Sequence, residues 1–180
     1  MKITYTSQQM LEEWKLRRAI GPMRADCTVT RSDGIDLDAL LTAEMRGWYL
    51  RLLDTAPPEM LAPEDISALV EITIDSTTGA LIVILPPQCR RVIEVKLKGW
   101  TTPAAPRQPD RYLSRLTANP FTSPDIHRPV AIAGYRSLTL LPLTSALPES
   151  LIAVMDHGDD IYTFDQRALE LITPDNSLLP

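Results

Sequence analysis

The sequence predicts an α+β fold with two N-terminal helices, a mainly antiparallel β-domain of about six or seven strands and a short C-terminal helix. Two patterns support this class. Apolar residues with helical spacing occur mainly before residue 56, whereas short alternating runs recur from residue 66 onward. Turn residues, and not long helical crossovers, separate most of these runs, which favours antiparallel pairing.

Length and composition indicate one folded domain. The 180 residues are 44% hydrophobic, close to the average of globular proteins. We expect a single domain over 1–173, with a helical part at 1–56, a β part at 66–165 and a terminal helix at 165–172, followed by a tail at 174–180. The chain has 16 prolines and only 7 glycines, so its connections are expected to be stiff.

The first helix is expected at 7–19. Thr6 or Ser7 can cap it, and Gln9 stands three residues after Thr6, which is the spacing of a capping box. Apolar side chains that include Trp14 fall near one face. Gly21 and Pro22 are expected to end the helix.

The second helix is expected to begin at Leu37 with Asp36 as its N-cap and to end before Pro57-Pro58. Its apolar stripe has helical spacing and comprises Leu37, Leu41, Met45, Trp48 and Leu52. The stretch "DGIDLD" at 33–38 resembles a calcium loop, but Leu40 stands where such a loop has its bidentate glutamate. Helix capping therefore explains these aspartates better.

The strands are expected from residue 68 onward. "ALVEITID" and "GALIVILP" predict a hairpin around 76–79 with Gly79 in the special backbone position. Residues 92–97 predict a third strand, with Val95 and Leu97 inward and Glu94 and Lys96 in water. "PVAIAG" and "SLTLLPL" predict a pair around 135–136. "LIAVMD" and "DIYTFD" predict a last hairpin through 157–159.

Between the third and fourth strands, the stretch "PDRYLSRLTANP" at 109–120 predicts a short helix. Asp110 is a suitable N-cap, and the apolar side is expected to consist of Tyr112, Leu113 and Leu116.

The stretch "MDHGDDIYTFD" at 155–165 is the one local cluster of potential metal ligands. Asp156, His157, Asp159 and Asp160 lie within five residues, and such oxygen and nitrogen donors bind metals. Glycine and aspartate are also ordinary turn residues, and neighbours at a hairpin tip splay apart. A turn is the preferred interpretation, and a metal-dependent hydrolase using His157 is an alternative.

Other signals of chemistry are weak. His127 lies beside Asp125 and Arg128 in a loop, and no serine has a nucleophile-elbow context. Cys27 and Cys89 match no ligand spacing and are expected as buried thiols, with a disulfide between them as the alternative. No phosphate-binding glycine motif occurs. We therefore expect a protein that is not an enzyme and that uses neither a metal nor another cofactor.

Charge and hydropathy restrict the partners. A net charge of −5 argues against affinity for nucleic acid phosphates. The longest apolar run, "GALIVILPP", is too short to span a bilayer, and the N-terminus has no apolar signal-peptide core. A cytoplasmic protein, or a particle assembled in the cytoplasm, is expected, with proteins as partners.

Four stretches together resemble the tail-adaptor proteins of short-tailed bacteriophages, also called head–tail connectors or tail tubular proteins. They span about residues 36–165. These stretches are "DLDALLTAEMRGWYLRLLD", "LPPQCRRVIEVKLKG", "RYLSRLTANPFTSPDIHRPVAI", and "SLTLLPL" with the late strands that contain Tyr162.

The resemblance implies a structural role in the virion. Proteins of that family form a ring beneath the portal and contact the portal and the next tail component. Homo-oligomerisation is therefore expected in the assembly, with a monomer as the alternative state of the isolated protein. The family tends to end in substantial helices, whereas "QRALELITPDN" provides about two turns here. The first two helices would then have a larger share in assembly.

Two sets of residues are the predicted interface. One is the exposed part of the first two helices, with Arg17, Arg18 and Arg51. The other is the loop at 119–129, where Phe121 is an expected anchor and His127 a further contact, because aromatic side chains dominate interface energies. Packing within the domain is the alternative for both sets. An interaction domain of an unrelated bacterial complex is the alternative function.

Overall fold

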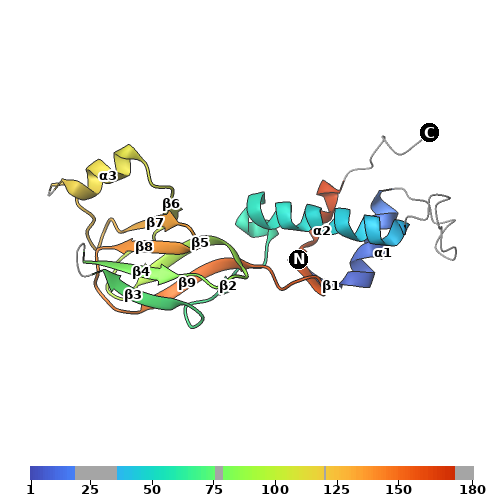
Figure 1. Cartoon of the computed structure of the whole chain (residues 1–180), viewed down its shortest axis with the longest axis horizontal. Coiled ribbons are helices and arrows are strands. Elements are labelled where there is room, and N and C mark those ends of the chain that lie inside the picture. The colour runs from blue at the N-terminus through green and yellow to red at the C-terminus, as the bar shows by residue number, and fades with distance from the viewer. Residues whose placement is uncertain (19–35, 76–78, 120, 173–180) are drawn as a thin grey trace. The chain divides into compact units, whose positions relative to one another are not determined.

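The computed structural model describes residues 1–18, 36–75, 79–119 and 121–172 and confirms the α+β class (Figure 1). Its contacts divide the chain into two compact units. Unit 1 is Met1–Ala62 together with Asp156–Pro180, and unit 2 is Pro63–Met155. Both ends of the chain therefore contribute to unit 1, and unit 2 is an insertion in it. The expectation of one domain over 1–173 stays a prediction.

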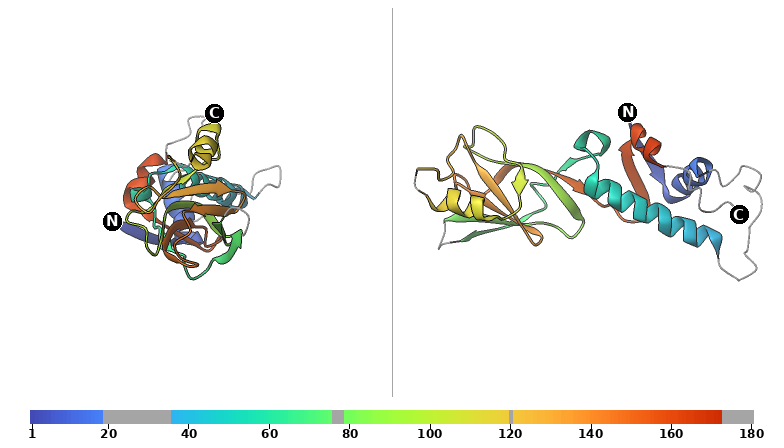
Figure 2. Two further views of the ribbon diagram at one scale, coloured as in Figure 1. Left: turned by 90° about the vertical axis from the view of Figure 1, so that its left-hand side faces the viewer. Right: turned by 90° about the horizontal axis from the view of Figure 1, so that it is seen from above.

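The helices of unit 1 begin where the sequence predicts. Helix α1 is Ser7–Arg17, and Thr6 and Gln9 form the capping box, with each side chain bonded to the other residue's backbone. Helix α2 is Leu37–Thr55, and the Asp36 carboxylate accepts from the backbone N–H groups of Asp38 and Ala39. The helices lie side by side (Figures 1 and 2). The predicted stop at Gly21-Pro22 lies outside the described residues.

The sheet of unit 1 joins the two ends of the chain. Strand β1, Lys2–Thr6, pairs antiparallel with β10, Ile161–Asp165. Strand β1 has no counterpart among the elements predicted from the sequence. A 3₁₀ turn η2, Pro58–Met60, follows α2, and a 3₁₀ helix η3, Gln166–Leu171, stands where the terminal helix was expected.

Aromatic side chains form the core of unit 1. Phe164 of β10 packs edge-on to Trp48 with ring centroids 5.8 Å apart, and Trp48 in turn contacts Trp14 at 5.6 Å. Tyr49 packs edge-on to Tyr162 at 4.8 Å. Each aromatic pair of this geometry stabilises the fold by about 0.5–1.5 kcal/mol beyond the free energy gained from burying its surface area. The aromatic residues therefore hold α1, α2 and the small sheet together.

The last predicted hairpin is wrong. Strand β9, Pro148–Met155, pairs with β2 and β5 in unit 2, whereas β10 pairs with β1 in unit 1. An alternating pattern identifies a strand but not its partner. Residues 156–160 therefore connect the two units and are not the tip of a hairpin.

Unit 2 is built from two mainly antiparallel sheets. One has the order β2-β9-β5, with β2 at Glu64–Asp65 and β5 at Cys89–Leu97. The other has the order β3-β4-β8-β7-β6, with β3 at Glu71–Asp75, β4 at Ala80–Ile84, β6 at Pro106–Arg107, β7 at Val130–Gly134 and β8 at Ser137–Leu141. Only the β6–β7 pair is parallel among the described strands. The buried faces contribute to one cluster, which includes Leu81, Val83, Val95, Leu97 and Trp100.

The predicted hairpins inside unit 2 are confirmed. β3 pairs with β4, and Gly79 has a φ of 62°, a left-handed conformation that glycine adopts without strain. β7 pairs with β8 around Tyr135 and Arg136. In β5, Val95 and Leu97 are buried as predicted, but Glu94 and Lys96 are half-buried and not fully in water. Lys96 forms an ion pair with Glu149 of β9.

Helix α3, Arg111–Ala118, begins at the predicted cap, since the Asp110 carboxylate accepts from the N–H of Leu113 at 2.6 Å. Leu113 is buried, but Tyr112 is 68% exposed, so its predicted inward position is wrong. Successive helical residues are about 100° apart, and the narrow buried face of α3 includes Leu113 but not its neighbour. The side chain of Leu116 lies outside the described residues.

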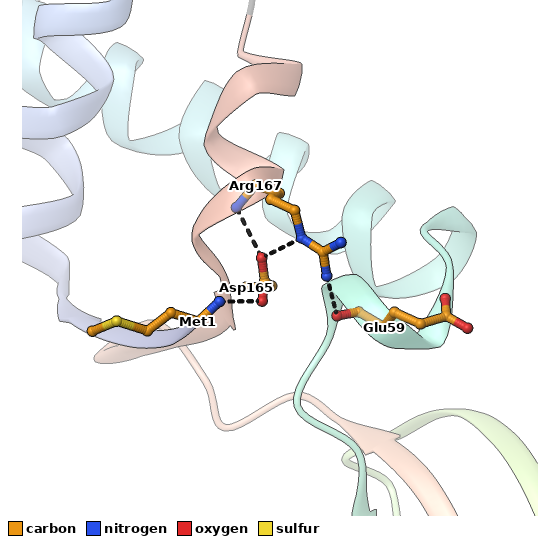
Figure 3. A network of polar contacts seen from close by, with 4 residues as sticks. All are labelled: Met1, Glu59, Asp165 and Arg167. Atoms are coloured by element: carbon orange, nitrogen blue, oxygen red, sulfur yellow. Dashed lines mark hydrogen bonds and ion pairs between the residues drawn. The ribbon is translucent and has the colours of Figure 1, made fainter.

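A polar network fastens the chain's first residue to the end of β10 (Figure 3). The N-terminal ammonium group of Met1 lies 2.7 Å from Asp165 Oδ2, and the other carboxylate oxygen accepts from Arg167 Nε at 2.8 Å. The Arg167 guanidinium also donates to the backbone carbonyl of Glu59. Hydrogen bonds from Arg167 and the N-terminal ammonium lower the pKa of the buried Asp165 carboxyl well below its usual value.

Asp165→Asn is expected to lower the melting temperature at pH 7, because it removes the charge that both cations contact. A depressed pKa means that the carboxylate stabilises the fold above the pKa of the unfolded chain, about 3.9, and loses this effect as pH falls below it. The difference between wild type and variant should therefore shrink below about pH 4. Thermal melts between pH 7 and pH 3 measure it. A difference that grows with acid would contradict the assignment.

Gly47 lies in the middle of α2, although no described contact leaves too little space for a larger side chain there. A Cβ added there would lie 4.0 Å from Arg51 Nη1, the flexible end of a side chain, and would meet nothing closer. Glycine in a helix interior is about 1 kcal/mol less favourable than alanine. No contact within the described residues therefore requires glycine at this position.

Gly47→Ala is expected to raise the free energy of unfolding by about 1 kcal/mol. Ala43→Gly, one turn earlier on the same helix at an exposed position, should lower it by a similar amount. Urea denaturation of both variants measures the two changes. A loss of stability in Gly47→Ala would show that the position is sterically occupied in the folded protein.

Candidate interaction surfaces

A groove of about 640 Å³ lies in unit 1 where α1, α2 and the end of η3 meet. We call it the helix groove. Residues that line it include Trp14, Leu40, Gly47, Trp48, Arg51 and Leu171. Leu40 is 43% and Leu171 50% exposed, although both are apolar. The groove therefore offers apolar surface that the described residues leave in contact with solvent.

Three charged side chains border the helix groove. Arg18 lies 3.3 Å from Glu44, and its guanidinium is 5.4 Å from the centre of the Trp14 ring, a cation–π distance. Arg51 is exposed and has no ion pair with the described residues. The border of the groove is thus cationic on balance.

The buried indole N–H of Trp14, a residue that lines the helix groove, has no acceptor among the described residues. The Trp14 side chain is 4% exposed, and its indole Nε1–H forms no hydrogen bond within the part of the chain that the structure describes. Buried indole N–H groups usually find a partner. Trp14 therefore departs from this rule, and it does so at a residue that lines the helix groove.

The structure separates the three predicted interface arginines by environment. Arg17 is half-buried, pairs with Glu13 and donates to the carbonyl of Leu169, so contacts within unit 1 engage it. Arg18 and Arg51 both line the helix groove. Their role in an interface stays a prediction.

The loop that carries Phe121 and His127 lies in unit 2. Phe121 is 97% exposed, so its ring adds nothing to the packing of the unit. His127 is also exposed, and its Nδ1 lies 3.2 Å from Thr101 Oγ1. The Asp125 carboxylate accepts from the N–H groups of His127 and Arg128, which lowers the pKa of Asp125 and shapes the turn. The loop thus exposes the Phe121 ring to solvent, while hydrogen bonds to Asp125 hold the turn that follows it in the chain.

The acidic cluster at 156–160 is held by an arginine of α2. Arg46 donates to both carboxylate oxygens of Asp156, at 2.7 and 2.8 Å, and its Nε lies 2.6 Å from Asp159. The guanidinium also lies 5.8 Å from the centre of the Tyr49 ring. Partial burial works to lower the pKa of Arg46, but the hydrogen bond and charge of Asp156 and the charge of Asp159 outweigh it and raise the pKa.

This arrangement explains the cluster without a metal. Two of the four predicted ligands point to Arg46, and His157 is exposed. Within residues 1–18, 36–75, 79–119 and 121–172, no group of three or more His, Cys, Asp or Glu side chains is arranged to hold a metal ion. Arg46 is 110 positions from Asp156, so no local sequence signal could have identified it.

Cys89, the described helices and the comparisons with known proteins point to no reactive site in the described residues. Cys89 is a free, half-buried thiol whose pKa is raised by burial; Cys27 lies outside the described residues. None of the described helices is long and apolar enough to cross a membrane. Comparison with known proteins finds no family model that matches the chain and no similar protein among the curated ones.

Arg46→Met is expected to lower the free energy of unfolding by about 1–2 kcal/mol, because the mostly buried Asp156 carboxylate would lose its charged partner. Asp160→Asn is the matched control, since no described contact of its side chain involves Arg46, and it should change stability by less than about 0.5 kcal/mol. Urea denaturation distinguishes them. Equal effects would show that Arg46 does not hold the connection.

Proposed function

We propose that this protein is a non-enzymatic structural subunit of a phage or prophage virion, acting as a head–tail connector or tail adaptor. The observation that carries the proposal is that each unit exposes apolar side chains of its own. In unit 1 these are Leu40 and Leu171 at the helix groove, and in unit 2 they are Tyr112 and Phe121. A connector must contact more than one neighbour, and two separate apolar surfaces suit that task.

The exposure of Phe121 supports this proposal most directly. A ring that is 97% exposed contributes almost no burial to its own unit. Burial of such a ring against a partner is worth about 1.5–3 kcal/mol. The hydrogen-bonded Asp125 turn holds part of the same loop in shape, which lowers the entropy lost on association.

The helices of unit 1 support a role in assembly through their size. The family that residues 36–165 resemble tends to end in substantial helices. Here η3 has only six residues, whereas α2 has 19 and α1 has 11. Contacts with a neighbour or a portal would therefore fall to α1 and α2, which line the helix groove.

The test is co-assembly of the full chain with the portal and tail proteins encoded in the same genome. Light scattering of the chain alone and of the mixtures should show defined oligomers or a defined complex. Phe121→Ser should weaken the complex at least about tenfold, as expected for a central aromatic anchor. Tyr135→Ser is the matched control, because Tyr135 is 94% exposed on the β7–β8 turn of the same unit.

A chain that stays monomeric at every concentration and binds none of these proteins would contradict the proposed role. A stable complex with proteins of another bacterial system would favour the interaction-domain alternative.

A further inference from the structure

We infer that the helix groove binds a short segment of a partner protein that carries an apolar side chain next to a carboxylate. This inference rests on the proposed assembly function and names the chemistry of one partner. Three features of the groove support it: the unpaired indole of Trp14, the glycine at position 47 and the cation of Arg51.

The Trp14 indole indicates that an acceptor is missing. Its N–H is buried and finds no acceptor within the described part of the chain, although Trp14 lines the groove. A buried donor without a partner is unfavourable. A peptide segment in the groove would bring backbone carbonyl groups, the commonest acceptors in proteins. Because the nitrogen has almost no accessible surface, the Trp14 ring would turn toward the groove to reach one of them.

Gly47 indicates a close approach from outside. Apart from the backbone of α2 and the two chain neighbours, the end of the Arg51 side chain is the one described group within 4 Å of the space that a Cβ would fill. The helix would be more stable with alanine there. A glycine that no described contact requires, in the wall of the helix groove, leaves room for another chain to approach the backbone of α2.

Arg51 indicates the charge of that chain. By composition unit 1 is acidic, with fifteen acidic and nine basic residues, yet the groove is bordered by Arg18, Arg51 and one acid, Glu44. Glu44 is paired with Arg18, whereas Arg51 has no ion pair among the described side chains. A carboxylate on the partner would therefore complement Arg51 and discriminate against basic segments.

The size of the groove limits what enters it. A volume of about 640 Å³ lies within the range of pockets that bury a whole small ligand, which is room for a short peptide segment. We therefore expect a short segment with one apolar anchor over Gly47 and Trp48, and not a broad protein surface.

A selection from a random peptide library on the immobilised full chain tests the inference. Wild type should enrich peptides that place an acidic residue beside an apolar one. Gly47→Leu should weaken binding of a selected peptide at least tenfold by filling the space, and Arg51→Glu should reverse the preferred charge. The matched controls are Ala39→Leu, on an exposed part of α2 outside the groove, and Arg107→Glu, exposed in unit 2; both should bind as wild type does.

The tryptophans report the location of binding. In protein labelled with 5-fluorotryptophan, the selected peptide should move the fluorine resonances of Trp14 and Trp48 and leave that of Trp100, which lies in unit 2. Thermal melts confirm that each variant is folded. Selected peptides that bind all variants equally, or that move only the Trp100 resonance, would overturn the inference.

Two other occupants are outcomes of the same measurements, and either would overturn the inference. If a chain that stops after Ile172 shifts the Trp14 resonance without peptide, the protein's own terminal residues occupy the groove. If Trp14 and Trp48 shift with protein concentration as the mass doubles, a second copy occupies it. A wild type that co-assembles with the portal but selects no groove-dependent peptide would refute this inference and leave the proposed function standing.

Discussion

Pairing of the first strand with a strand near the end of the chain is the interaction on which unit 1 depends. β1 and β10 bring together residues about 160 positions apart, and Phe164 and Tyr162 of β10 then supply rings to the core that α1 and α2 complete. Without this pairing, Trp48 and Tyr49 of α2 would lose their contacts with the rings of β10. The polar network of Met1, Asp165 and Arg167 fastens the same pair of strands at its end.

Bringing β1 and β10 together closes a loop of about 150 residues, which costs conformational entropy. The folding of unit 2 within that loop lowers this cost. In unit 2, β2 pairs with β9, with Glu64 opposite Ala153, so the two ends of unit 2 are adjacent once it folds. The Asp65 carboxylate strengthens this closure by accepting from the N–H groups of Ser67 and Leu151. Once unit 2 is folded, the entropy lost on pairing β1 with β10 is that of ordering the rest of the loop, and the residues of unit 2 no longer add to it. Arg46 holds the connection that leaves unit 2 by binding Asp156 and Asp159.

The two units use their polar side chains mainly for structure. The aspartates at 36, 110, 125 and 165 cap helices or turns, and those at 156 and 159 pair with Arg46. What the units leave to solvent includes large apolar side chains, Phe121 above all. This division, with these aspartates bonded within the fold and the Phe121 ring left to solvent, supports the proposed role in assembly.

The sequence alone was sufficient for features whose cause is local. The caps at Thr6 and Asp36, the hairpin at Gly79 and the start of α3 at Asp110 each depend on residues within a few positions of one another, and all four are confirmed. Contacts between distant residues were decided by the tertiary structure. The partner of β10, the binding of Asp156 by Arg46, the outward position of Tyr112 and the space beside Gly47 follow from which surfaces meet. Periodicity fixes how a strand or helix alternates, but the choice among possible partners depends on packing across the whole chain.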